Sequence, residues 1–155
     1  MKTKTNGIDN HTISDLNISQ YMGTWYEIAR YEHSFEKGMT HVTATYAIKP
    51  NGKIMVLNEG YKQGKHKQVI GKAYQPQTTE PGKLKVSFFL WFYSDYYIME
   101  LDKDYQYAVI GSSSEKYLWI LSRTKTLPAP VYAELLQRIQ KRGYNTEKLI
   151  LVQQE

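Results

Sequence analysis

Short stretches in which apolar and polar residues alternate run along most of the chain, separated by residues that favour turns. A period of two is the pattern of a strand whose two faces meet different surroundings. Pro50-Asn51-Gly52 and Gln63-Gly64 offer the positive φ angles that hairpin turns need, and Pro81-Gly82 interrupts the pattern again. Eight strands are therefore predicted, at residues 23–32, 40–48, 53–61, 67–74, 83–89, 96–102, 105–111 and 117–123. Eight short strands at this spacing are typical of an all-β barrel or sandwich.

The period of the pattern changes after Pro128. An apolar stripe with helical spacing follows, made of Val131, Leu135, Leu136 and Ile139. Because Gly143 can adopt the left-handed conformation that ends a helix, a helix is predicted at residues 129–142. A last strand is predicted at residues 147–152. A sandwich does not ordinarily end with a helix and a lone strand, so this ending favours the barrel.

Two strand-like runs far apart in the chain are predicted to meet. The first is GTWYEIAR, which begins at Gly23, and the second is YLWILSR, which ends at Arg123. In an antiparallel barrel the first and last strands are neighbours, because closure leaves no exposed edge. This would lay the guanidinium of Arg123 across the indole of Trp25, a contact worth about 0.5–2 kcal/mol that closes one end of the barrel. Gly23 suits the tight entry, where a Cβ would crowd the neighbouring backbone.

These residues also carry a family resemblance. The Gly-x-Trp signature and the lone arginine, with the runs GTWYEIAR, VTATY, KVSFF, YLWILSR and LVQQ in this order, resemble the lipocalins. They are similar to bacterial lipocalins of the outer-membrane lipoprotein type, relatives of apolipoprotein D. The resemblance implies an all-β fold, an eight-stranded antiparallel up-and-down barrel with one C-terminal helix packed on the outside and a short final strand. One motif departs from the family pattern, since Thr-Asp-Tyr appears here as the run Asp102-Lys103-Asp104-Tyr105.

A length of 155 residues predicts one domain at residues 18–155, preceded by a polar N-terminal arm at residues 1–17. The first twelve residues of that arm are expected to be loose. Aromatic residues make up 14% of the chain and include fourteen tyrosines. Tyrosine combines an apolar ring with a polar tip, so this excess suits strands and the lining of a cavity that binds an amphiphile.

Charge and residue types narrow the classes of function. The net charge of +5 is spread along the chain without a block of like charges, which argues against nucleic-acid binding and is compatible with a weak preference for anionic lipid surfaces. Cysteine is absent, which excludes a disulfide, a thiolate zinc site and a cysteine nucleophile. No phosphate-binding glycine loop and no serine in a nucleophile elbow occurs. An enzyme is not expected, and Glu27 is the one candidate for a buried acid or base.

Neither a cofactor nor a metal is expected. His33, Glu36 and His41 lie close together in the sequence, but their spacing matches no zinc pattern, so a solvated loop is the favoured interpretation. The sequence has no apolar run of bilayer length and no signal-peptide core in its first seventeen residues, so a soluble chain is expected. The family resemblance implies the outer membrane or the periplasm, where many relatives are anchored through an N-terminal cysteine. The sequence leaves monomer and homodimer open.

Alternation along each strand predicts which side chains face the barrel interior. On the first strand the predicted inward residues are Trp25, Glu27, Ala29 and Tyr31, and the predicted outward residues are Tyr26, Ile28 and Arg30. The other strands contribute Ala44, Ile54, Val56, Asn58, Gly60, Leu84, Val86, Phe88, Tyr97, Met99, Leu101, Trp119 and Leu121. Large aromatic residues mixed with alanine and glycine favour a hollow interior. The residues predicted to contact a ligand are Asn58, Tyr97, Trp119, Tyr46, Phe88, Val86, Met99, Ala29 and Tyr93.

Apolar walls with a few polar groups are typical of a small-molecule site. By resemblance, the ligand is a fatty acid or a lysophospholipid, carried or stored in connection with the bacterial envelope. The alternative is a module that binds a protein or a membrane through the aromatic run at residues 89–93, which could form an apolar rim or simply pack over the barrel mouth.

Overall fold

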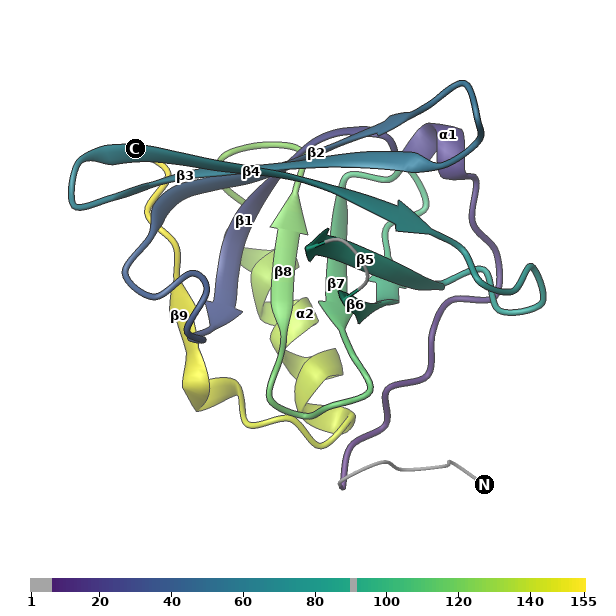
Figure 1. The fold of residues 1–155 in the computed structure, drawn as a ribbon. Helices are drawn as coiled ribbons and strands as arrows, with labels where there is room; N and C mark the ends of the chain where they lie inside the picture. The colour runs from purple at the N-terminus through teal and green to yellow at the C-terminus, as the bar shows by residue number, and fades with distance from the viewer. Residues whose placement is uncertain (1–6, 90–91) are drawn as a thin grey trace.

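The computed structural model describes residues 7–89 and 92–155, and within them the chain forms a closed antiparallel barrel (Figure 1). The barrel strands are β1 Gly23–Tyr31, β2 Thr40–Ile48, β3 Ile54–Lys62, β4 Lys65–Tyr74, β5 Lys83–Phe89, β6 Phe92–Leu101, β7 Tyr107–Gly111 and β8 Trp119–Ser122. Each strand pairs with the next, and β1 pairs with both β2 and β8, which closes the sheet. The all-β fold class predicted from the sequence, an eight-stranded barrel, is confirmed.

Helices and a ninth strand complete the fold. The remaining elements are α1 Ile18–Tyr21, α2 Ala129–Lys141, the 3-10 helix η1 Thr146–Lys148 and β9 Leu149–Leu151. Strand β9 pairs with the second half of β1. Strand β6 begins at Phe92, four residues earlier than predicted, and Phe92 pairs with Phe89 at the end of β5, so these two residues of the segment expected as a loop at residues 89–93 belong to strands.

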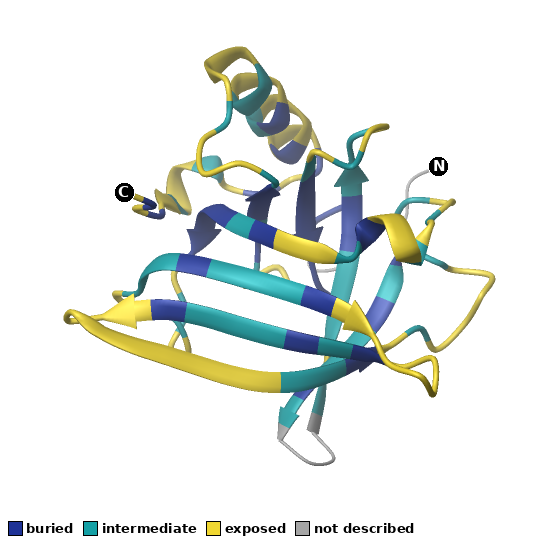
Figure 2. Ribbon diagram, turned by 90° about the horizontal axis from the view of Figure 1, so that it is seen from above, coloured by how far each residue is buried: buried dark blue, intermediate teal, exposed yellow. Residues whose placement is uncertain are grey.

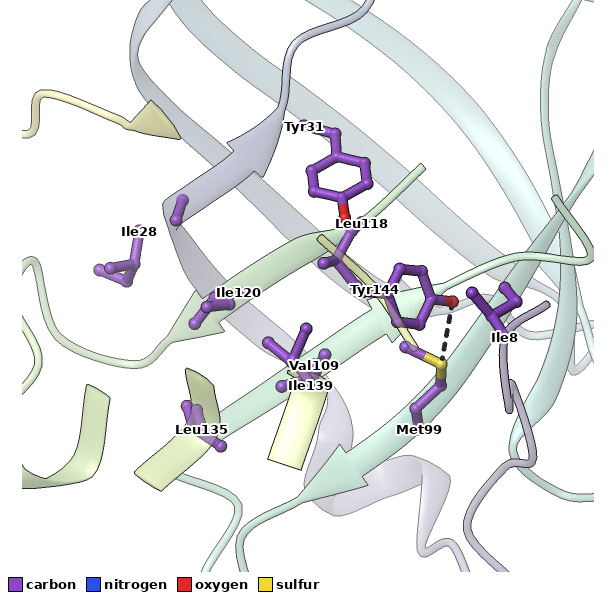
Figure 3. Packing of buried hydrophobic residues seen from close by; sticks show 11 residues of the cluster. Ile8, Ile28, Tyr31, Met99, Val109, Leu118, Ile120, Leu135, Ile139 and Tyr144 are labelled. Carbon is purple, nitrogen blue, oxygen red and sulfur yellow. Dashed lines mark hydrogen bonds between the residues drawn. The ribbon is translucent and has the colours of Figure 1, made fainter. Parts of the chain in front are cut away.

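Helix α2 lies against the outside of the barrel, as the family resemblance implied (Figure 1). Pro128 caps its start, and Gly143 follows its end with a φ of +98°. Its apolar stripe packs on a cluster that we call the outer core, shown in Figure 3. The outer core consists of Ile8, Ile28, Ala29, Tyr31, Met99, Val109, Leu118, Ile120, Leu135, Ile139 and Tyr144. The wall of the barrel separates the outer core from a second cluster inside the barrel, which we call the barrel core.

The barrel core lies on the inner face of the barrel. Its buried residues are Tyr21, Trp25, Tyr46, Ile54, Val56, Ala73, Leu84, Ile98, Ala108, Ile110 and Leu121. Strand β1 contributes to both cores, because its pairing with β8 shifts between Glu27 and Ala29. Such a bulge inserts one residue and reverses the faces of the side chains that follow.

The N-terminal arm is more ordered than the sequence indicated. Ile8 and Asp9 are buried, and the backbone N–H of Asp9 donates to the carbonyl of Arg142 at 2.7 Å. The Arg142 guanidinium donates in turn to the carbonyls of Asp9 and His11 and to both the carboxylate of Glu100 and the carbonyl of Met99. The expectation of a loose arm is therefore wrong for residues 8–12. The arm is ordered by a long-range contact with Arg142, which the local polarity of the arm does not indicate.

One end of the barrel is closed by the predicted pair of Trp25 and Arg123. The Arg123 guanidinium carbon lies 3.9 Å from the centre of the indole, and its nitrogens donate to the carbonyls of Gln20, Thr24 and Tyr105. Gly23 has a φ of +99°, and an added Cβ would lie 3.2 Å from Nη1 of Arg123. The predicted stacking is confirmed, and the structural role of these residues stays a prediction.

Replacing Arg123 by alanine should lower the free energy of unfolding by about 1–3 kcal/mol, because the cation–π contact, the apolar stem and three hydrogen bonds are lost together. Denaturant unfolding measures the effect. The matched control is Lys125→Ala, which removes the same charge from an exposed neighbour. Equal midpoints for the two variants would contradict a structural role for Arg123.

Candidate ligand-binding site in the barrel

Five residues predicted to contact a ligand lie on the inner face of the barrel. Tyr46 is part of the barrel core, and Val86, Phe88 and Trp119 pack against it. The pairing of β3 with β4 runs without a shift from Ile54 to Lys62, which places Asn58 on the same face as Val56. An added Cβ at Gly71 would lie 2.5 Å from the Phe88 ring, so a glycine there lets that ring lie across the inner wall.

Three other predicted contact residues face outward. Ala29 and Met99 belong to the outer core, and Tyr97 packs against it. For Ala29 the cause is the bulge in β1. For Tyr97 and Met99 the predicted alternation began on the wrong face, because Tyr96 and Ile98 line the interior instead. A second shift in pairing follows Ile98, so Leu101 still points inward as predicted.

Tyr93 is the fourth correction. Its ring makes an edge contact with Tyr74 at 5.2 Å, and the Lys72 ammonium lies 5.9 Å from its centre. Tyr74 and Lys72 flank the inward-facing Ala73, so they lie on the outer face of β4. Tyr93 therefore contributes to the outer surface and not to the interior. The neighbouring residues Leu90 and Trp91 lie outside the described part of the chain, as do the side chains of Phe89 and Phe92, so the predicted aromatic rim stays a prediction.

Three tyrosine hydroxyls meet inside the barrel, a feature that the sequence analysis missed. The hydroxyls of Tyr21 and Tyr96 are 2.7 Å apart, and that of Tyr46 donates to Tyr96 at 2.9 Å. Burial raises the pKa of all three phenols above its ordinary value, so they stay neutral. Tyr21 also packs on Trp25, with ring centres 4.9 Å apart. The floor of the interior therefore carries a hydrogen-bonding group surrounded by apolar walls.

A second polar group lies at the other end of β1. Arg30 was predicted to face solvent, yet its side chain is only 1% exposed. The guanidinium donates to the carboxylates of Glu27 and Glu32, at 3.1 and 2.9 Å, and to the carbonyls of Glu36 and Met39. Residues three apart on a regular strand face opposite sides, so the bulge is what brings Glu27 and Arg30 together.

Glu36 lies in the β1–β2 loop, and its contact with Arg30 connects that loop to β1. Its Oε1 accepts from Nε1 of Trp119 at 2.9 Å and lies 2.6 Å from Nε2 of His33. Burial alone would raise the pKa of Glu36, but hydrogen bonds from His33, Glu27 and Trp119 together lower it. Burial and the adjacent Glu36 carboxylate raise the pKa of Glu27, against the opposing effect of Arg30.

His33 and Glu36 are thus held by contacts with each other and with Trp119 rather than solvated, which corrects the expectation for these two residues, while most of the loop around them is exposed. His41 takes no part, since its ring contacts Thr40 and Tyr61 instead. No group of three metal-ligating side chains forms anywhere in the described ranges. Neither residue type nor spacing could have predicted this cluster, because its partners come from β1, β8 and the loop.

The inward face of β4 becomes exposed toward the β3–β4 hairpin. Val69 pairs with Asn58 and shares its inward face, yet its side chain is 48% exposed. Lys67 and Lys65 continue the same face toward the hairpin turn and are exposed. The β3–β4 hairpin and the β1–β2 loop therefore lie at the end of the barrel opposite Trp25, where this inward face is exposed.

A separate hollow of about 410 Å³ lies on the outside, between α2, β6 and the N-terminal arm. It is lined by charged side chains, among them Asp9, Glu100, Arg138 and Arg142. Arg142 and Glu100 already bind each other there, at 2.7 Å. Its lining suits the attachment of the arm and offers no apolar wall to a hydrophobic ligand.

A closed barrel of eight strands is wide enough either to be filled by side chains or to hold one small ligand, and with a helix on its outer wall this one belongs to the class of small up-and-down β-barrels. A family model described as a lipocalin-like domain matches residues 16–154. The outer membrane lipoprotein Blc of Vibrio cholerae serotype O1 is 43% identical over 146 residues, which cover 92% of this chain and 85% of that protein. The chain belongs to the lipocalin family, and the resemblance found in its sequence motifs is confirmed.

One further relative and one solved structure show how widely the fold is shared. Apolipoprotein D of Cavia porcellus is 33% identical over 149 residues, which cover 90% of this chain and 78% of that protein. The structure of insecticyanin from the tobacco hornworm Manduca sexta matches with a TM-score of 0.77 at 21% identity, over 97% of this chain and 87% of that one. Membership of the family is consistent with the binding of hydrophobic ligands. Across the described ranges, no helix has the length and apolar character needed to cross a bilayer.

Proposed function

We propose that this protein binds an elongated hydrophobic ligand, a fatty acid or a lysophospholipid, in the barrel, and carries or stores it as part of lipid handling in the bacterial envelope. The observation that supports this most directly is the composition of the interior. Apolar side chains from β3, β5 and β8 line its length, while hydrogen-bonding groups gather at the floor and beside Trp119. An amphiphile, which has an apolar chain and a polar end, would find partners for both parts in this interior.

Burial supplies the affinity. Each methylene group moved from water into an apolar interior contributes about 0.8 kcal/mol before the costs of ordering. A long acyl chain therefore binds with few specific contacts. Asn58 and the tyrosine hydroxyls would take the polar end or a bound water, since a buried amide without a partner costs about 1–3 kcal/mol.

A location at the outer membrane or in the periplasm is part of this proposal. It is supported by the identity to outer membrane lipoproteins of the Blc type.

Titration with a long-chain fatty acid or a lysophospholipid tests the function. Tryptophan emission should change saturably, because Trp119 packs on the inner wall. Trp119→Phe should remove most of the change, whereas Trp91→Phe, the control, should not. Unchanged emission at micromolar protein, together with no heat in calorimetry at two temperatures, would refute the carrier function.

The alternative is then an interaction module that uses the aromatic run at residues 89–93. Lipid extraction and mass spectrometry separate the two directly, because a carrier should be purified with acyl lipids and an interaction module with a tightly bound partner.

A further inference from the structure

The outermost part of the β3–β4 hairpin extends beyond the rest of the barrel. Strand β5 pairs with β4 only over Lys72–Tyr74, so within the described ranges the edge of β4 from Lys65 to Ile70 has no strand beside it. Both faces of this stretch are exposed, and it forms a continuous yellow segment in Figure 2. We call residues 61–70, with the turn between the strands, the hairpin tip. Half of the backbone N–H groups on such an edge point outward without a strand partner.

The hairpin tip is basic. Lys62, Lys65 and Lys67 are all exposed, and the one acid of β3 and β4, Glu59, lies 3.8 Å from His66. Lysines on an edge strand are an ordinary protection against pairing with other strands. Two copies of this edge would also bring lysines against lysines, which disfavours a second copy of the chain as the occupant.

The same tip also exposes large apolar side chains, which protection of an edge does not require. Tyr61, Val69 and Ile70 are 44%, 48% and 62% exposed. Apolar side chains flanked by lysines are the composition of surfaces that bind anionic membranes, where the ammonium groups meet lipid phosphates and the apolar groups enter the interface. A polyanion in solution would match the lysines alone.

We propose that the hairpin tip docks edge-on against an anionic lipid bilayer. The lysines and the outward backbone N–H groups of β4 donate to lipid phosphates, and Ile70 and Val69 insert beside them. Because the hairpin tip lies at the same end of the barrel as the β1–β2 loop, docking places that end of the barrel at the lipid surface. The inference does not depend on the nature of the barrel ligand.

Sedimentation with vesicles tests the proposal. The full chain should partition onto vesicles of phosphatidylglycerol and phosphatidylcholine, and much less onto pure phosphatidylcholine. The variant Lys62→Gln, Lys65→Gln, Lys67→Gln should lose about fivefold per lysine, or about 100-fold in all. The matched control is Lys103→Gln, Lys125→Gln, Lys141→Gln, which makes the same change in net charge on exposed residues elsewhere and should lose about threefold or less.

A second variant keeps the charge. Val69→Ser with Ile70→Ser should weaken binding about tenfold at high salt, where the apolar contribution remains. Equal losses for the two lysine triples would overturn the proposal, as they would reflect net charge alone. It would also be overturned if the unmodified chain failed to bind anionic vesicles, or bound neutral ones equally well. Unchanged melting temperatures show that each variant is folded, and binding of a fatty acid in solution tests the barrel separately.

Discussion

Replacing Arg30 by methionine should lower the free energy of unfolding by about 3–5 kcal/mol, among the largest effects expected of a single substitution here. Methionine has a similar length but leaves the buried carboxyls of Glu27 and Glu36 without their cation. It also removes the donors that hold the carbonyls of Glu36 and Met39, and so releases the β1–β2 loop.

Chemical denaturation measures this loss, and Arg138→Met is the matched control. Arg138 also binds two carboxylates, those of Glu100 and Glu134, but its side chain is 53% exposed. Because solvent screens exposed ion pairs, the control should lose less than about 1 kcal/mol. Equal losses in the two variants would mean that burial adds nothing to the role of Arg30.

Filling the barrel should abolish ligand binding. Ala44 packs against the barrel core and lies opposite Trp25 on one side and Asn58 on the other. A barrel of eight strands has room for side chains or for one small ligand. An indole in place of the Ala44 methyl group should therefore occupy the space of an acyl chain and lower the affinity more than about 100-fold, the equivalent of several buried methylene groups.

Calorimetric titration suits this test, because the added indole alters fluorescence. The matched control is Ala47→Trp, on the opposite face of the same strand, where the residue is exposed and the affinity should not change. A smaller filling, Ala44→Leu, keeps the test informative if the indole overpacks the core. Ligand binding by Ala44→Trp with unaltered affinity would place the site outside the barrel.

Periodicity and turn residues predicted much of this fold for a physical reason. Strands β2 and β5 have the predicted bounds, and proline and glycine mark the end of β2 at Pro50-Asn51-Gly52 and the start of β5 at Pro81-Gly82. Their faces were also predicted correctly where one side is plainly polar, as in β5, whose Lys83 and Lys85 alternate with Leu84 and Val86. Pairing of the first and last strands followed from the need to close the barrel.

The same reasoning failed where both faces of a strand are apolar. On β6 Tyr97 and Met99 looked as suitable for the interior as Tyr96 and Ile98, because the outer core under α2 also needs apolar groups. On β1 a single inserted residue reversed the pattern, which no local property of the sequence indicates. The contacts of Glu36 with Trp119 and Arg30 join segments that only the closed barrel brings together.

Because β1 contributes to both cores, it affects how the molecule unfolds. Its backbone pairs with β2, β8 and β9, while its side chains serve the barrel core in the first half and the outer core in the second. Amide hydrogen exchange in β1 therefore requires both cores to come apart at once. Although a wall of sheet divides its apolar interior in two, we expect the molecule to unfold as a single cooperative unit, with β1 as the segment that exchanges last.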